Sequence, residues 1–136
     1  MSVVKSKRGQ SSVEFLDTAH KILQETLRIV VKHIPKRYTF YLSQKIVGHA
    51  TDGCSLVKQG NSIFVSKKED AALRREYFMR AYAEYQAMVS QITIAHELFH
   101  FPDETMVRWM ELISRELKVL KAVMQSDLAR FKALID

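Results

Sequence analysis

The chain has 136 residues, of which 47% are apolar and 26% are charged. This composition is typical of one globular domain and excludes a disordered tail protein or a collagen-like protein. Four glycines and two prolines are too few for the many turns of an all-β fold, so we expect a small number of long helices. The single cysteine, Cys54, has no partner within the chain, which favours a reducing compartment.

Positive charge is concentrated in the first half of the chain. Residues 1–68 carry 12 basic and 4 acidic side chains, whereas residues 69–136 carry 9 basic and 11 acidic ones. A basic surface of this kind can hold phosphate backbones or an acidic protein, or it can simply keep the protein in solution. The sequence contains neither the ~18 to 20 uninterrupted apolar residues of a membrane span nor the apolar block of a signal peptide. We therefore expect a cytoplasmic protein that does not contact membranes.

The first helix is expected to begin at Ser12. Residues 1–11 are polar and basic without periodicity, and we interpret them as a flexible basic arm in front of a single domain of residues 12–136. From Ser12 to Pro35, apolar residues recur at spacings of three and four, which is typical of an amphipathic helix. Pro35 is expected to end this helix because proline fits poorly into a helix interior.

A second and weaker helix is predicted over residues 37–65. Its valines, threonines and glycines form helices poorly, so burial would have to stabilise it. Gly53 and Gly60 could break this helix, or they could let a neighbouring helix approach closely.

Two further helices are predicted after residue 66. Ser66 and Glu69 have the spacing of a capping box at the start of the third helix, which keeps its register as far as Pro102. Asp103 or Thr105 is expected to cap the fourth helix. Its apolar residues recur every three or four positions, as in a bundle seam: Met106, Met110, Ile113, Leu117, Leu120, Met124, Leu128, Phe131 and Ile135. Because the links between the four helices are short, the sequence predicts an all-α, antiparallel up-down-up-down four-helix bundle.

The segment HELFH at residues 96–100 matches the H-E-x-x-H pattern of zinc hydrolases. In that pattern His96 and His100 would bind zinc, and Glu97 would activate water. A catalytic zinc site also needs a third protein ligand, and folding the fourth helix back about Pro102 places no carboxylate opposite the histidines. The alternative is a histidine pair on the flank of the helix that forms hydrogen bonds, caps the helix end or lines an interface between subunits.

No other catalytic pattern stands out in the sequence. The Cys54 thiol is expected to be buried and free. The tyrosines of the third helix, Tyr77, Tyr82 and Tyr85, are interpreted as core and interface aromatics instead of a platform for stacking bases.

Two parts of the sequence resemble a known family of four-helix bundles. The segment HIPKRYTFYLSQKI is similar to the helix junction of the family that includes rRNA intervening-sequence proteins and the accessory variability determinant (Avd) proteins of diversity-generating retroelements. The segments LRREYFMRAYAEYQAMVSQITIA and VRWMELISRELKVLKAVMQ resemble the Avd branch, and the resemblance covers about residues 13–126. The intervening-sequence branch usually carries Asn-x-x-Glu-Gly on its second helix, where this chain has GHATDGCSLVKQGNS, which also favours the Avd branch.

The resemblance implies a non-enzymatic protein without a cofactor. Avd proteins form ring-shaped homopentamers with a basic surface, bind a dedicated reverse transcriptase together with RNA or DNA, and support mutagenic cDNA synthesis. By matching positions, it implies six nucleic-acid-binding residues of low sequence specificity: Lys36, Arg37, Lys45, Arg74, Arg75 and Arg80. A small zinc metallohydrolase that uses His96 and His100, and a structural bundle with a protein partner, remain the alternatives.

Overall fold

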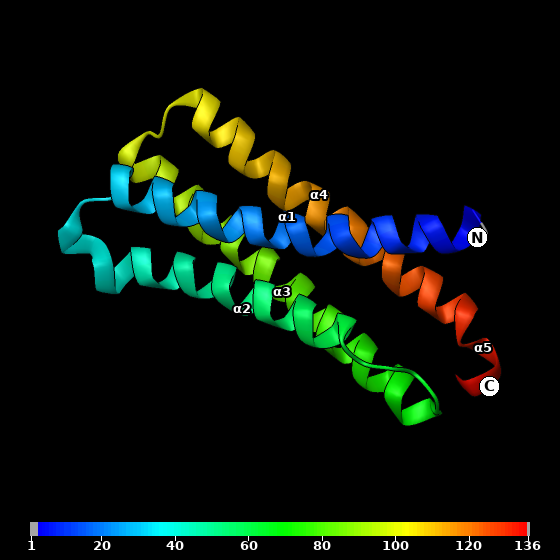
Figure 1. The fold of residues 1–136 in the computed structure, drawn as a ribbon. Coiled ribbons are helices and arrows are strands. Elements are labelled where there is room, and N and C mark those ends of the chain that lie inside the picture. The colour runs from blue at the N-terminus through cyan, green and yellow to red at the C-terminus, as the bar shows by residue number, and fades with distance from the viewer. Residues whose placement is uncertain (1–2, 136) are drawn as a thin grey trace.

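The computed structural model describes residues 3–135, and their side chains from Glu14 onward. Four long helices account for most of the chain (Figure 1): α1 (Val3–His33), α2 (Gln44–Asn61), α3 (Lys68–Phe99) and α4 (Asp103–Arg130). A 3-10 turn, η1 (Lys36–Tyr38), and a π-helical turn, η2 (Thr39–Ser43), join α1 to α2, and a short helix, α5 (Lys132–Ile135), follows α4. The described residues include no strand, so the predicted all-α class is confirmed.

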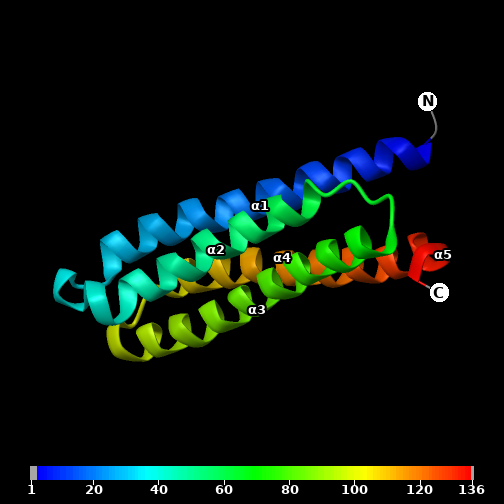
Figure 2. The same ribbon diagram turned by 90° about the horizontal axis from the view of Figure 1, so that it is seen from below.

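The four long helices lie side by side, and consecutive helices run in opposite directions (Figures 1 and 2). Each packs against its neighbours in the chain, and α1 also packs against α4. Of these four contacts, the one between α2 and α3 is the most extensive and the one between α3 and α4 the least. Within the described residues, no helix is long and apolar enough to cross a membrane.

The observed helix ends differ from the predicted ones in α1 and α4. Helix α1 begins at Val3 instead of Ser12. Its first residues are mostly straight-chain or small, and apart from Gly9 each costs only about 0.5 kcal/mol relative to alanine, so a helix already formed can extend through them. Pro35 lies just beyond its end, as predicted. Neither Asp103 nor Thr105 caps α4, because the helix starts at Asp103, directly after Pro102, without a side-chain cap.

The start of α3 uses a different carboxylate from the predicted one. Asp70, not Glu69, accepts hydrogen bonds from the Ser66 backbone N–H, the Ser66 hydroxyl and the Lys67 backbone N–H, at 3.1, 3.0 and 3.2 Å. These hydrogen bonds hold the pKa of Asp70 below its usual range. The helix begins at Lys68, so the predicted motif is displaced by one residue along the chain.

The second helical run is shorter than the predicted residues 37–65, because η1 and η2 occupy its start and α2 ends at Asn61. Gly53 and Gly60 do not break α2, and rings from α3 pack against them. A Cβ atom at Gly60 would lie 2.7 Å from Cε1 of Phe78, and one at Gly53 would lie 2.8 Å from Cζ of Tyr85. The glycines therefore admit aromatic side chains of the neighbouring helix.

The buried stripe of α4 differs from the predicted seam. It contains Ile113 and Leu120 as expected, but also Trp109, Glu116 and Asp127. The other predicted seam residues are half-buried or exposed: Met106, Met110, Leu117, Met124, Leu128, Phe131 and Ile135. Met106, Met110, Leu117 and Met124 still pack against the core, so the pattern found the correct side of the helix but missed its polar and aromatic members. The Trp109 indole, for example, donates a hydrogen bond of 3.0 Å to the buried Thr26 hydroxyl of α1.

Candidate nucleic-acid interface

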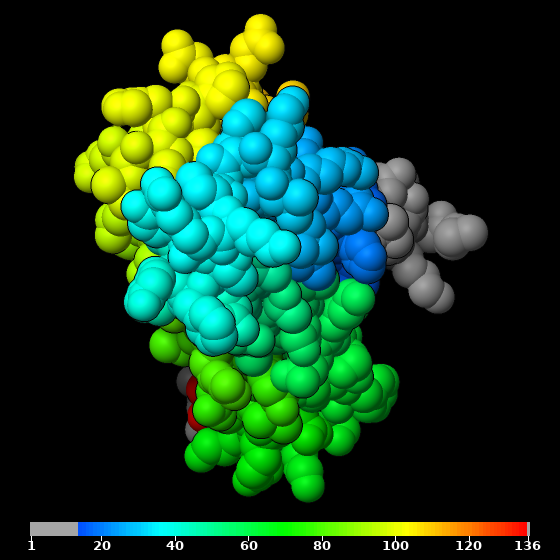
Figure 3. All heavy atoms as spheres, turned by 90° about the vertical axis from the view of Figure 1, so that its left-hand side faces the viewer, coloured from blue at the N-terminus to red at the C-terminus, as the bar shows by residue number. Residues whose placement is uncertain are grey.

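The junction between α1 and α2 stands at one end of the molecule. After Pro35, the Tyr38 N–H donates to the Pro35 carbonyl at 2.9 Å, and the Thr39 hydroxyl donates to the Lys36 carbonyl at 2.6 Å. These two bonds close the 3-10 turn, and the wider π-helical turn Thr39–Ser43 follows at once. On the face shown in Figure 3, the junction (cyan) projects between the α3–α4 turn (yellow) and the helices below it (green).

Two adjacent aromatic side chains of this junction lie on the surface. Phe40 is 78% exposed and Tyr41 is 76% exposed. Tyr38, in contrast, is half-buried and packs edge-on against Phe99 with 5.0 Å between the ring centroids. Burial of a large apolar side chain contributes about 1.5–3 kcal/mol, and folding does not gain this free energy from Phe40 and Tyr41. A ligand that covers the two rings could gain it instead.

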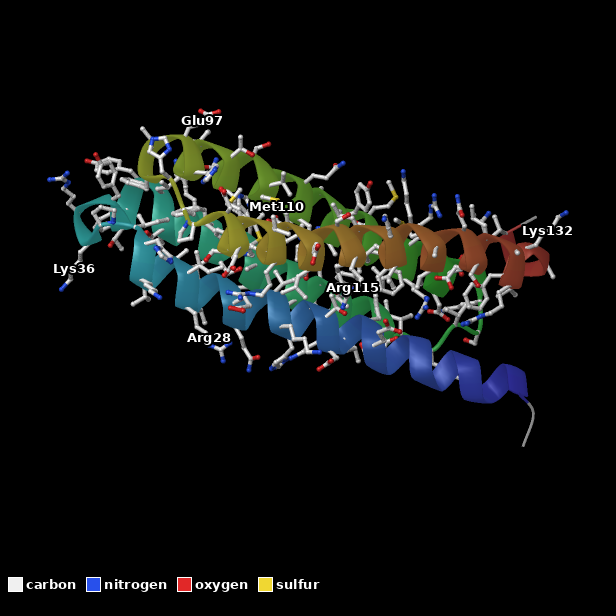
Figure 4. All side chains as sticks on the ribbon, turned by 90° about the horizontal axis from the view of Figure 1, so that it is seen from above. Arg28, Lys36, Glu97, Met110, Arg115 and Lys132 are labelled. Atoms are coloured by element: carbon white, nitrogen blue, oxygen red, sulfur yellow. The ribbon has the colours of Figure 1, made fainter. Side chains whose placement is uncertain are left out.

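Three of the six predicted basic residues flank these rings in the sequence. Lys36 and Arg37 lie on η1, Lys45 lies in the first turn of α2, and all three are exposed. None of them has a carboxylate within 4 Å among the side chains that the structure describes. The Arg37 guanidinium lies 5.4 Å from the centre of the Tyr38 ring, and Lys36 extends away from the helices in Figure 4. The junction therefore combines exposed aromatic rings with unpaired positive charge.

The other three predicted residues do not join this surface. Arg74 is buried, and its Nε donates to Asp127 Oδ2 at 2.6 Å, while its Nη1 donates to the Gly60 carbonyl at 3.3 Å. Because Gly60 is near the far end of α2, Arg74 is about 22 Å from Lys45 along that helix axis. The ion pair and the burial remove Arg74 from the candidate interface.

The neighbouring arginines of α3 lie elsewhere on the molecule. Arg75 is half-buried and lines a groove between α3 and α4. Arg80 is exposed on α3. The six residues inferred from the resemblance therefore do not form one continuous surface.

The HELFH segment does not lie on one uninterrupted helix. Helix α3 ends at Phe99, and His100 adopts a left-handed conformation with φ of 51°. Nδ1 of His96 accepts a hydrogen bond of 3.1 Å from the Phe101 backbone N–H, and the two histidine rings are 6.4 Å apart. Glu97 points into solvent (Figure 4). His96 thus stabilises the helix end, which is one of the roles that the sequence left open, and no group of three metal-ligating side chains occurs in the described part of the chain.

A buried polar cluster lies away from the junction. Glu116 of α4 and Tyr85 of α3 are both fully buried, and neither the Glu116 carboxyl oxygens nor the Tyr85 hydroxyl has a hydrogen-bond partner among the described residues. Burial raises the pKa of Glu116 to about 8. Burial also raises the pKa of Tyr85, and the nearby Glu116 adds to the effect. Cys54 is buried and free, as expected, and burial raises its pKa as well.

Sequence reasoning missed Phe40 and Tyr41 as candidate site residues. The signal was present, because the segment KRYTFY places three aromatic residues just after two basic ones. The exposure of both rings depends on the π-helical turn, which apolar periodicity does not reveal.

Comparisons with protein-family models, with curated proteins and with solved structures find no match to this chain.

Proposed function

We propose that this protein is a non-enzymatic accessory subunit that binds single-stranded RNA or DNA through the α1–α2 junction. Its resemblance to the Avd proteins further implies that it acts with a retroelement reverse transcriptase during mutagenic cDNA synthesis, and the sequence features given above favour the cytoplasm for this activity. The observation that carries the nucleic-acid part of this proposal is the pair of exposed rings, Phe40 and Tyr41, beside the unpaired cations Lys36, Arg37 and Lys45.

The chemistry of the junction suits a single strand of any sequence. Bases stack on aromatic rings with a gain of about 1–3 kcal/mol per base, and every base has a face that can stack. Lysine and arginine bind the phosphates and release counterions, so affinity falls with salt. The junction offers no arrangement for reading base edges in a duplex groove, which agrees with the expected low sequence specificity.

Self-association is part of the proposal. Leu27 and Val31 on α1 are 44% and 82% exposed, and Ile94 and Leu98 on α3 are 47% and 58% exposed. A single core does not use these apolar side chains, which supports assembly with further copies of the chain. In the ring of five that the resemblance implies, the junction would occur once in each subunit, and several weak contacts would act together on one strand. Native mass spectrometry of the purified protein tests the subunit number.

Fluorescence anisotropy with labelled oligo(dT) and oligo(U) of about 20 nucleotides tests the proposed interface. We expect Phe40→Ala with Tyr41→Ala to weaken binding by about tenfold or more while leaving the salt dependence unchanged. Lys36→Ala with Arg37→Ala should weaken binding and also flatten the dependence on salt.

The matched control is Lys67→Ala with Lys68→Ala, which removes the same charge at the opposite end of the bundle (Figure 1). This variant should bind like the wild type. If the control loses as much affinity as the Lys36 and Arg37 variant, binding depends on net charge and the interface is wrong. If the wild type binds neither oligonucleotide at low salt, a structural bundle with a protein partner becomes the better explanation.

A further inference from the structure

A groove lies between α3 and α4, outside the core and away from the junction. Its volume is about 320 Å³, and α3 contributes Arg75, Met79 and Tyr82 to its wall. The opposite wall comes from α4, with Lys121, Met124 and Leu128. Met79 and Leu128 are 53% and 45% exposed. Three residues of the groove are therefore apolar, and two are basic.

The groove follows from the way α4 packs. The buried stripe of α4 runs through Leu120 and Asp127, so Lys121, Met124 and Leu128 come next around the helix and remain beside the core instead of entering it. The contact between α3 and α4 is also the least extensive of the four between neighbouring helices. Two of the side chains predicted for the bundle seam, Met124 and Leu128, thus form the wall of an open surface feature.

The charge in the groove has one sign and is not neutralised by the described part of the chain. Arg75 and Lys121 have no carboxylate within 4 Å, and the groove lining includes no acidic residue. Nη1 of Arg75 is buried and has no hydrogen-bond acceptor among the described residues. The Arg75 side chain as a whole is half-buried and lines the groove, so a carboxylate that reaches its guanidinium from the groove would gain a charge-assisted hydrogen bond.

The length of the groove matches two turns of a helix. Arg75 and Tyr82 are about 10 Å apart along α3, and so are Lys121 and Leu128 along α4. Positions i, i+4 and i+7 of a docked helix span the same length. Methionine side chains adapt their shape to different apolar partners, which suits Met79 and Met124 to such a surface.

We propose that this groove docks an acidic amphipathic helix of a partner protein. Apolar side chains of that helix would lie between Met79, Met124 and Leu128, and its carboxylates would pair with Arg75 and Lys121. Single-stranded nucleic acid fits less well, because the lining is mainly apolar and its one ring, Tyr82, is half-buried. The inference does not rest on the proposed nucleic-acid interface, which uses other residues at the other end of the bundle.

Three synthetic helical peptides of about 14 residues test the proposal with the full-length protein. They share leucines at i, i+4 and i+7 and carry only glutamate, only glutamine or only lysine on the flanking positions. We expect the acidic peptide to bind at least about tenfold more tightly than the basic one, with the neutral one between them. Its addition should shift the methyl NMR signals of Met79 and Met124 but not that of Met88, which is buried in the core.

Charge-removing variants locate the contact. Arg75→Gln and Lys121→Gln should each weaken binding of the acidic peptide by about fivefold or more. Arg80→Gln and Lys118→Gln are the matched controls, since both side chains are exposed on the same two helices and do not line the groove. These controls should bind the peptide like the wild type.

Four outcomes would overturn the proposal. The first is that the acidic peptide does not bind or that all three peptides bind alike. The second is that the controls lose as much affinity as Arg75→Gln. The third is a lower subunit number for Arg75→Gln by native mass spectrometry, which would mean that a second copy of the chain occupies the groove. The fourth is displacement of the peptide by oligo(dT) together with loss of oligo(dT) binding in Arg75→Gln, which would assign the groove to nucleic acid.

The peptide test and the nucleic-acid test are separate measurements. Because binding of nucleic acid by the wild type is measured on its own, failure of one proposal is recognised without the other.

Discussion

Helix α4 buries two carboxyl groups about three turns apart, Glu116 and Asp127, and the protein accommodates them in opposite ways. Asp127 accepts a hydrogen bond of 2.6 Å from Nε of the buried Arg74, and the two side chains form an ion pair. Glu116 has no hydrogen-bond partner among the described residues, and burial raises its pKa to about 8. Near neutral pH, Glu116 is therefore mainly a neutral acid, whereas Asp127 is joined to the Arg74 guanidinium.

The surroundings of the two acids share one element, an aromatic ring of α3 that packs on a glycine of α2. Beside Asp127, the Phe78 ring of α3 packs on Gly60 of α2, and the Arg74 guanidinium lies 4.7 Å from the ring centre. Beside Glu116, the Tyr85 ring of α3 packs on Gly53 of α2. We call these two sets of neighbouring residues the Asp127 layer and the Glu116 layer.

One difference between the two sites lies on α3. The residue four places before the ring, which lies next to it on a helix, is Arg74 in one layer and Ala81 in the other. Arg74 thus supplies the cation that pairs with Asp127, and alanine stands at the matching position near Glu116. Exchange of these acids for neutral residues should accordingly have different consequences in the two layers.

The largest expected effect is a pH dependence of stability that Glu116 controls. The folded protein keeps this proton up to about pH 8, whereas an unperturbed carboxyl group releases it near pH 4.5. The folded state therefore binds more protons between these values, and the free energy of unfolding should fall by about 1.4 kcal/mol per pH unit as the pH rises. The other titratable groups noted close to Glu116, Tyr85 of α3 and Cys54 of α2, both have raised pKa values and stay neutral over this range.

Glu116→Gln keeps the shape of the side chain and removes the titration. Urea unfolding at several pH values between 5 and 8 should show the difference between this variant and the wild type widening with pH, toward about 4 kcal/mol at the upper end. All other titrating groups are common to the two proteins and cancel in this comparison. Two unfolding free energies that run parallel across the pH range would contradict a buried neutral acid.

The next largest effect is expected at Asp127. Asp127→Ala leaves the buried Arg74 guanidinium without its carboxylate and should reduce the free energy of unfolding by about 3 kcal/mol. The double variant Asp127→Leu with Arg74→Met removes both charges and should be more stable than Asp127→Ala. Thermal and urea unfolding at pH 7 measure both. Equal losses in the single and double variants would mean that packing, and not the ion pair, makes Asp127 important.

A smaller loss is expected when either glycine is replaced. Gly60→Ala and Gly53→Ala would place a Cβ atom 2.7 and 2.8 Å from the nearest ring atom, so the ring or the helix has to shift, at a cost of about 1–3 kcal/mol. Because the Arg74 guanidinium packs on the Phe78 ring, the loss of stability in Gly60→Ala should depend on that arginine. A double-mutant cycle of Gly60→Ala with Arg74→Met tests this coupling, and Gly53→Ala with Arg74→Met, at the other layer, should be additive. Additivity in both cycles would show that neither glycine site is energetically coupled to Arg74.

The apolar pattern predicted the helices but not the two buried acids. Pro35, the spacing of apolar residues and the scarcity of glycine were sufficient to expect the all-α class and the end of α1. Glu116 and Asp127 stand at helical spacing from the buried Ile113 and Leu120, but acidic side chains are rarely buried, so their residue type assigns them to the surface. Their burial depends on contacts with residues far away in the chain. Asp127, for example, pairs with Arg74, and a pattern within one helix cannot reveal a partner on another helix.

The candidate interface was predicted in part for a similar reason. Lys36, Arg37 and Lys45 were inferred from the resemblance, and they are close in the chain, on η1 and in the first turn of α2. Arg74 and Arg75 are adjacent in sequence, yet one is in the core and the other in a groove, because neighbouring positions on a helix face directions about 100° apart. Only the packing of α3 against α2 and α4 decides which of them is buried.

The smallest effect is expected for removal of the Tyr85 hydroxyl. This change tests directly whether Glu116 lacks a hydrogen-bond partner. Because this buried hydroxyl has no hydrogen-bond partner among the described residues, Tyr85→Phe removes an unsatisfied polar group and should stabilise the protein by up to about 1 kcal/mol. A loss of stability of similar size would instead mean that the hydroxyl donates to Glu116, directly or through a water molecule. The two cases also differ in their pH dependence. Desolvation alone raises the pKa of Glu116, so Tyr85→Phe should leave the pH window of Glu116 unchanged, whereas loss of a donor to the carboxylate would raise that pKa and extend the window to higher pH. Urea unfolding of Tyr85→Phe at the same pH values as Glu116→Gln therefore separates an unpaired acid from one with a hidden partner.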